Sequence, residues 1–146
     1  MVKRWLLSIV MAAIAVLMAG VVSAADVNLS LTGTASTEGP YSYPFPVSNV
    51  NDGDLTTTWF RTGPGTLEDS EPQSVEIELA GLSLVSSVIL DSSINLGGRT
   101  PKDFNVQVSR DGVNYATVLQ VSGNTSTIKL IQFAEPVLVT NVRVVL

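Results

Sequence analysis

The sequence contains neither cysteine nor histidine. Without histidine, a serine or cysteine catalytic triad cannot form, and acid–base catalysis by an imidazole is excluded. The candidates for a catalytic carboxylate pair are Glu68, Asp69 and Glu71, which lie together in a polar stretch typical of a solvated loop. Without cysteine, no disulfide can brace the fold, so its stability has to come from packing of the core. We therefore expect a non-catalytic domain.

Positive charge is also scarce. The chain has 8 basic and 13 acidic residues, a net charge of −5. Two of the basic residues, Lys3 and Arg4, lie at the extreme N-terminus, and without them the net charge is −7. No basic cluster remains that could bind phosphates, so we expect no nucleic-acid binding and no binding to anionic membranes.

The first 24 residues have the pattern of a secretory signal peptide. Lys3 and Arg4 precede an apolar run over residues 5–22, and Val22-Ser23-Ala24 is a small-residue cleavage site. The alternative is a retained membrane anchor, since a run of this length can just span a bilayer. Its alanine content and its small-residue ending favour cleavage. We expect residues 1–24 to be removed and residues 25–146 to form one secreted or cell-surface domain.

The rest of the chain has β-strand patterning almost throughout. Residues 74–79 (S-V-E-I-E-L) and 104–109 (F-N-V-Q-V-S) alternate between apolar and polar side chains, which is typical of half-buried strands. Their polar members, expected to face outward, are Glu76, Glu78, Asn105, Gln107 and Ser109. Further β-branched runs cover residues 85–91, 115–121, 127–133 and 139–146. With a hairpin turn at Asp111-Gly112, the pattern predicts an all-β antiparallel sandwich of jelly-roll type.

One polar loop, residues 48–59 (S-N-V-N-D-G-D-L-T-T-T-W), concentrates oxygen donors. Carboxylates, amides, threonine hydroxyls and backbone carbonyls are the ligands that a hard cation prefers. The alternative is a simple polar turn, because Asp-Gly is also a common turn dipeptide. The loop is not an EF-hand, since the twelfth position from Asp52 is Gly63, which has no carboxylate. Trp59, which ends the loop, is expected in the core.

The order of motifs resembles a known family. The quoted segments are residues 28–36 (N-L-S-L-T-G-T-A-S), 48–59, 73–80 (Q-S-V-E-I-E-L-A), 99–115 (R-T-P-K-D-F-N-V-Q-V-S-R-D-G-V-N-Y) and 142–146 (V-R-V-V-L). This series resembles the discoidin, or coagulation-factor C-type, domain, including its bacterial carbohydrate-binding branch. The resemblance covers nearly all of residues 25–146. It implies an eight-stranded jelly-roll sandwich of galactose-binding-like fold.

The resemblance also implies a structural calcium ion in the loop at residues 48–59. Its ligands would be the backbone carbonyl of Asn49, the carboxylate of Asp52, a carboxylate or carbonyl oxygen of Asp54, and the hydroxyl or carbonyl of Thr57. In the family, a later strand that carries a glutamate completes the site, whereas this sequence ends within the V-R-V strand. We therefore expect the last strand to be missing, through fragmentation or because another chain supplies it, and calcium binding to depend on it.

Ligand binding in this family uses long loops at one end of the sandwich. Here two long loops, residues 34–54 and 61–73, carry prolines, glycines and aromatics on the β scaffold. The resemblance implies the ligand-binding residues Glu38, Tyr41, Tyr43, Phe60, Arg61, Asn95 and Arg99. Phe60-Arg61 occupies the place where many galactose-binding members have a histidine, so the identity of the sugar stays open.

The implied function is a secreted, non-catalytic carbohydrate-binding module, expected at the N-terminus of a larger exported glycan-active protein. The alternative is a protein or cell-surface adhesion module that uses the same loops. Phospholipid binding, known for other discoidin domains, is not expected because the long loops here are acidic. The implied partner is therefore a glycan or glycoconjugate.

Overall fold

The computed structural model describes residues 27–38, 45–59, 73–94 and 100–146. Within these ranges the chain is all-β apart from two short 3-10 turns, as the sequence patterning predicts. The elements are η1 (Leu29–Thr32), β1 (Thr34–Thr37), η2 (Val47–Val50), β2 (Ser74–Asp91), β3 (Phe104–Ser109), β4 (Tyr115–Val121) and β5 (Ile128–Val145). No helix in the described ranges is long and apolar enough to cross a membrane. The predicted signal peptide lies outside these ranges.

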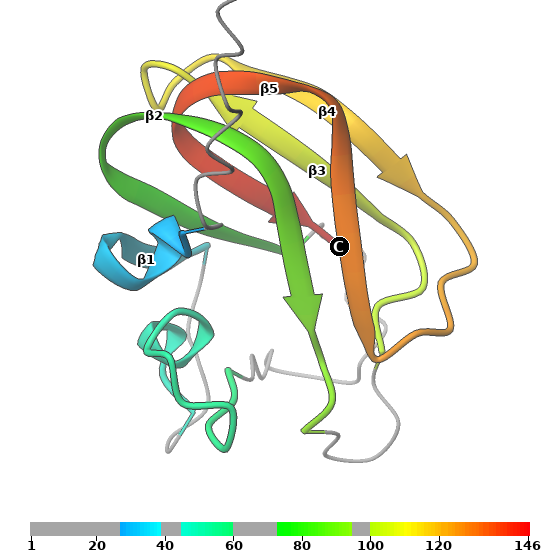
Figure 1. Cartoon of the computed structure of the whole chain (residues 1–146). Coiled ribbons are helices and arrows are strands. Elements are labelled where there is room, and N and C mark those ends of the chain that lie inside the picture. The colour runs from blue at the N-terminus through cyan, green and yellow to red at the C-terminus, as the bar shows by residue number, and fades with distance from the viewer. Residues whose placement is uncertain (1–26, 39–44, 60–72, 95–99) are drawn as a thin grey trace, which may run out of the picture.

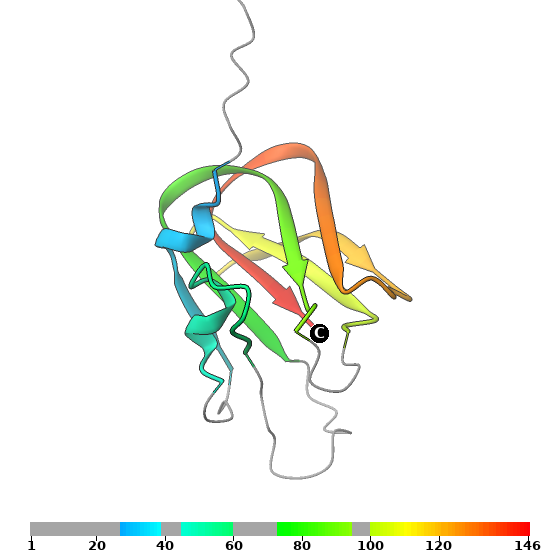
Figure 2. The ribbon, with the colours of Figure 1, turned by 60° about the horizontal axis from the view of Figure 1, so that its bottom comes forward.

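All strand pairs are antiparallel, and the order across the sheet is β1-β2-β5-β3-β4. The two longest strands, β2 and β5, have 18 residues each and pair with one another from end to end. Both curve back over the sheet as arches, so that the second half of β2 and the first half of β5 form a front layer (Figures 1 and 2). The back layer contains β1, β3, β4 and the other halves of β2 and β5.

The arches correct one detail of the sequence prediction. Two separate strands were expected over residues 74–79 and 85–91, and two more over 127–133 and 139–146, but each pair is one continuous bent strand. The bends lie at two irregularities: residues 79–82 of β2 stand opposite Thr140 alone, and residues 133–136 of β5 stand opposite Ser86 alone. Extra residues on one strand increase its local bend. Gly81 and Pro136 lie within these insertions, where a regular ladder is already interrupted.

The hydrophobic core lies between the two layers. Its buried members are Leu79, Val85, Phe104, Val106, Val108, Ile131, Phe133, Val139 and Val144. Val106 and Val139 are 0% exposed, and Ile131 is 1% exposed. The inward placement of the apolar residues of 104–109 is confirmed. Trp59, expected in the core, is only half-buried.

The predicted Asp111-Gly112 hairpin turn joins β3 to β4. Gly112 has a φ of +69°, a conformation that glycine adopts readily. The Asp111 carboxylate accepts hydrogen bonds from the backbone N–H groups of Val113 and Asn114 at 2.9 and 2.8 Å. Ser109, expected to be exposed, is only 2% exposed because its hydroxyl is enclosed by this turn, where it accepts a hydrogen bond from the Gly112 N–H.

The face of the back layer that is turned away from the core carries polar side chains in rows across the strands. One row consists of Ser36, Glu76, Arg143, Gln107 and Thr117, one residue from each strand. The adjacent row includes Asn105 of β3 and Gln120 of β4, which are direct partners. Residues opposite each other in an antiparallel pair point to the same side, so these polar groups share one surface.

Candidate cation loop and ligand-binding end

The polar loop at residues 48–59 folds back on itself through side-chain caps. Gly53 has a φ of +80°, which lets the chain reverse between the two aspartates. The Asp52 Oδ1 atom accepts a hydrogen bond from the Asp54 N–H at 2.8 Å. Asp54 Oδ1 in turn accepts from both the N–H and the hydroxyl of Thr56, at 2.8 and 2.6 Å. These bonds, the side-chain one first, lower the pKa of the Asp54 carboxyl and favour its ionised form.

Three of the four predicted metal-ligating residues are brought together in this loop. The Thr57 hydroxyl lies 2.8 Å from Asp52 Oδ2 and 2.9 Å from the backbone carbonyl oxygen of Asp54. A hydroxyl has one proton, so it can satisfy only one of these two acceptors fully. The Asp52 carboxylate and the Asp54 carbonyl thus both lie within hydrogen-bond distance of the Thr57 hydroxyl, and only one proton is available to the three oxygens. This oxygen-only donor set fits a calcium ion.

The fourth predicted ligand, Asn49, has a second role that the sequence did not indicate. Its side-chain N–H donates to the carbonyl of Thr58 at 2.8 Å and closes the loop. Asn51, for which the sequence predicts no role, fixes the loop to the N-terminal segment. Its side-chain N–H groups donate to the carbonyls of Ser30 and Gly33 at 2.8 and 3.0 Å. The two amides hold the oxygen cluster in place beside η1 and β1.

Carboxylates contribute only part of the donor set. Among the residues that the structure describes, no group of three or more His, Cys, Asp or Glu side chains is positioned to hold a metal. A cation in the loop would therefore depend on carbonyl and hydroxyl oxygens as well as on Asp52 and Asp54. The ligand role of the Asn49 carbonyl stays a prediction.

Of the predicted ligand-binding residues, only Glu38 lies within the described ranges. It is exposed and directly follows β1. Strand register places it at the end of the sheet where β2 begins and β5 ends, because Thr37 pairs with Val75, which pairs with Val144. The other members of the predicted set, all outside the described residues, are Tyr41, Tyr43, Phe60, Arg61, Asn95 and Arg99.

The sequence matches the F5/8 type C domain family over residues 32–146. Chitosan-binding module 1 of a chitosanase/glucanase from Paenibacillus sp. IK-5 is 27% identical, with a TM-score of 0.68 over 82% of this chain and 86% of that chain. The family 32 CBM from C. perfringens NanJ, solved in complex with galactose, is 20% identical, with a TM-score of 0.69 over 80% of this chain and 83% of that chain. A comparison with proteins of curated function gave no match.

A third similar structure belongs to a much longer chain. SpGH29 is 26% identical, with a TM-score of 0.64, and the match covers 82% of this chain but only 24% of that chain. These likenesses confirm the expected β-sandwich of discoidin type. Together with the family match over residues 32–146, they lead to one assignment. The chain belongs to the F5/8 type C domain family.

Proposed function

We propose that this protein is a secreted, non-catalytic carbohydrate-binding module with a structural calcium ion. The observation that carries the proposal is the likeness to a chitosan-binding module at 27% identity, which extends over 86% of that module. A galactose-bound module of family 32 has the same fold. Two structural neighbours that bind carbohydrates therefore support a carbohydrate ligand. Chitosan and galactose differ, so the identity of the sugar stays open.

The absence of catalysis is supported by the chemistry of the side chains. The sequence offers no histidine or cysteine. Within the described ranges, the carboxyl groups with a shifted pKa are Asp54 and Asp111, and in both cases the pKa is lowered by hydrogen bonds from the turn. A general acid in a glycosidase needs the opposite shift, a raised pKa. These two carboxylates are therefore suited to holding turns.

Sugar binding is assigned to the loops at the Glu38 end of the sandwich. Glu38 would accept hydrogen bonds from ring hydroxyls, and Arg99 with Asn95 would supply planar donors. Tyr41, Tyr43 and Phe60 would pack on the apolar face of the ring, and Arg61 would also contact the sugar. Such a site needs a rigid scaffold more than buried catalytic groups, and an antiparallel sandwich provides one.

Calcium is proposed as a brace for this scaffold. Asp52, Asp54 and Thr57 would hold it, with the Asn49 carbonyl. The ion would supply positive charge at the point where their oxygens converge. The side chain of Asn51 already connects the loop to Ser30 and Gly33, so a bound ion would stiffen the link between residues 48–59 and the N-terminal edge of the sheet. Its effect would be on stability and not on chemistry.

Export and a larger parent protein complete the proposal. Residues 1–24 would direct secretion and be cleaved. A chain such as SpGH29, of which this domain corresponds to 24%, shows the kind of architecture in which a similar domain occurs. We propose the same arrangement here, with this domain as the N-terminal module of an exported glycan-active protein.

Affinity electrophoresis in gels that contain chitosan or galactose-bearing polysaccharide tests the proposal. Wild-type protein should be retarded by at least one of these polymers, and Arg99→Ala should migrate as in a sugar-free gel. Arg110→Ala is the matched control, because Arg110 is exposed and follows the opposite end of β3. Loss of retardation in Arg99→Ala with retention in Arg110→Ala supports the proposal.

Two outcomes contradict it. One is a folded wild-type protein that neither these gels nor a glycan array retains. The other is retention that Arg99→Ala leaves unchanged. Capture of a membrane-fraction protein that persists in excess free sugar would favour the adhesion function instead.

A further inference from the structure

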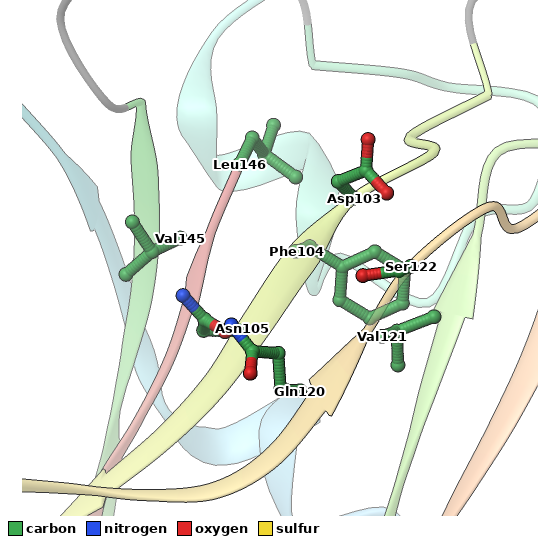
Figure 3. Close-up of a pocket in the computed structure, with 8 residues that line it drawn as sticks. All are labelled: Asp103, Phe104, Asn105, Gln120, Val121, Ser122, Val145 and Leu146. Atoms are coloured by element: carbon green, nitrogen blue, oxygen red, sulfur yellow. The ribbon is translucent and has the colours of Figure 1, made fainter.

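We propose that the chain carries a second sugar subsite, at the ends of β3, β4 and β5, built from residues other than those assigned above. A pocket of about 250 Å³ lies there (Figure 3). Its polar lining comes from Asp103, Asn105, Gln120 and Ser122, and Val145 and Leu146 contribute apolar lining. The inference rests on the proposed function for the class of ligand, but its residues are different ones.

The amides of Asn105 and Gln120 are available to a ligand. The two residues are direct partners across β3 and β4, and their side chains lie close together in Figure 3. Neither amide makes a hydrogen bond to another side chain or backbone group in the described part of the chain. Each amide offers both donors and an acceptor. The two adjacent amides therefore form one polar surface whose donors and acceptors are free of hydrogen bonds to the described residues.

In the neighbouring row, by contrast, the polar side chains make hydrogen bonds to one another. There Gln107 accepts two hydrogen bonds from Arg143, at 3.0 and 2.7 Å, and donates to the Thr117 hydroxyl at 3.3 Å. Gln107 and Gln120 thus occupy the same face of the same hairpin, but the first is engaged and the second is not. This contrast identifies Asn105 and Gln120 as the ligand-accessible pair.

Asp103 adds a fixed negative acceptor at the edge of the pocket. Its Oδ1 atom accepts a hydrogen bond from the Gly123 N–H at 2.9 Å, which orients the carboxylate. The second carboxylate oxygen has no such bond to any residue that the structure describes. An oriented carboxylate beside two amides is suited to neighbouring hydroxyls, because each hydroxyl can donate to one group and accept from another.

The apolar lining and the volume of the pocket are suited to a ligand the size of one sugar ring. Val145 is half-buried and offers accessible hydrocarbon to a C–H-rich ring face. Pockets for drug-sized molecules typically measure roughly 300–1,000 Å³. At about 250 Å³, this pocket suits one ring or the end of an oligosaccharide.

The subsite and the Glu38 end lie at the same end of the sheet but near opposite edges. Glu38 follows β1, the first strand in the order, whereas the pocket spans β5, β3 and β4, with β2 between them. A long glycan that engages both would be held at two points. Linked binding of this kind raises the apparent affinity without any stronger single contact.

Side-chain amide NMR provides the test, with isotope-labelled protein and the probes galactose and chitotriose. At least one probe should shift the NH₂ signals of Asn105 and Gln120 in a saturable way. Asn105→Ala and Gln120→Ala should each weaken that binding about tenfold, as expected from loss of a net pair of hydrogen bonds. Gln132→Ala is the matched control, an exposed glutamine of the front layer whose amide donates to the Ser86 carbonyl, and it should leave the titration unchanged.

The outcomes separate this inference from the proposed function. If the two amide signals shift in Arg99→Ala as in wild type, the pocket binds sugar by itself, even if the loop site fails. If neither probe shifts these signals, or if Gln120→Ala titrates like wild type, the subsite inference is wrong. In that case, loss of gel retardation in Arg99→Ala, with retardation kept in Arg110→Ala, would still support the proposed loop site. Melting temperatures of the two alanine variants should match wild type, because neither amide supports the fold.

Discussion

The guanidinium carbon of Arg143 lies 3.7 Å from the centroid of the Tyr115 ring. Two of its nitrogens, Nε and Nη2, donate to Gln107 Oε1 at 3.0 and 2.7 Å, so the group is fixed both in position and in plane. The Tyr115 hydroxyl is screened from solvent and makes no hydrogen bond of good geometry. Burial, together with the nearby Glu76 carboxylate, raises the pKa of Tyr115 to about 12.

This pKa makes stability depend on alkaline pH. The ordinary tyrosine pKa is 10.0, so as pH rises the unfolded chain loses the proton before the folded chain does. The contribution of Tyr115 to stability is therefore complete below pH 10 and is lost as pH rises toward about 12. Ultraviolet titration of tyrosinate should resolve one late-ionising group that disappears in Tyr115→Phe. Ionisation of all 3 tyrosines near pH 10 would contradict the assignment.

Arg143→Lys should destabilise the fold although charge is conserved. A lysine ammonium cannot lie flat on Tyr115 while it donates two bonds to one Gln107 oxygen. We expect a loss of about 1–2 kcal/mol in the free energy of unfolding, measured by urea denaturation. Arg110→Lys is the control, because Arg110 is exposed and should tolerate the change. Equal stability of both variants would show that the stacked geometry contributes nothing.

Gly33 should not tolerate even alanine. A Cβ atom there would lie 2.6 Å from the Glu78 carbonyl oxygen and 2.7 Å from Ile77 Cγ2. Backbone cannot move aside cheaply, so Gly33→Ala should cost about 1–3 kcal/mol. Gly81→Ala, where a Cβ would meet nothing within 4 Å, should be neutral or slightly stabilising. Thermal unfolding of the two variants side by side checks both expectations.

The proposed calcium site should appear as a metal-dependent melting temperature. Calcium should raise the melting temperature of the chelator-treated protein, since a ligand that binds only the folded state stabilises it. Asp52→Ala should abolish this increase, because the Asp52 carboxylate contacts the Thr57 hydroxyl at 2.8 Å. Asp91→Ala, which removes an exposed carboxylate outside the loop, should respond to calcium like wild type. Coincident melting curves with calcium and with chelator would refute the site.

Ile131 should be the most sensitive isoleucine of the front layer. It is 1% exposed, whereas Ile89, on the adjacent strand of the same layer, is 66% exposed. Ile131→Ala should lower the free energy of unfolding by about 2–5 kcal/mol, and Ile131→Val by about 0.5–1.5 kcal/mol. Ile89→Ala should cost much less. Similar losses at both positions would mean that the outward face of this layer is covered in solution.

Much of the fold could be predicted from local patterning. The boundaries of β3 and β4 agree with the runs at residues 104–109 and 115–121, because alternation and an Asp-Gly turn are local signals. The continuity of β2 and β5 could not be predicted in this way. Gly81 and Pro136 resemble breaks between strands. The pairing of β2 with β5 on both sides of these residues joins each run to the next, and local patterning does not reveal it. The first four residues expected in the loop at 34–54 form β1 for the same reason.

For the candidate cation loop, residue types indicated the chemistry but not the support. Asp52, Asp54 and Thr57 could be selected because their oxygen atoms are the relevant property. The clamp by Asn51 depends on where Ser30 and Gly33 lie in space, which sequence spacing does not reveal. The availability of Gln120, in contrast to Gln107, likewise depends on a partner strand and not on either residue itself.

The arched strands also bear on how the chain folds. The partners that are nearest in sequence between β2 and β5 are Asp91 and Ile128, and the most distant are Ser74 and Val145. A long loop must therefore close before this ladder can begin, which predicts slow, millisecond-to-second folding. Since the same two strands build both layers, neither layer can persist alone. Hydrogen exchange should accordingly report one cooperative unit, with amides at Ile77 and Val88 opening together.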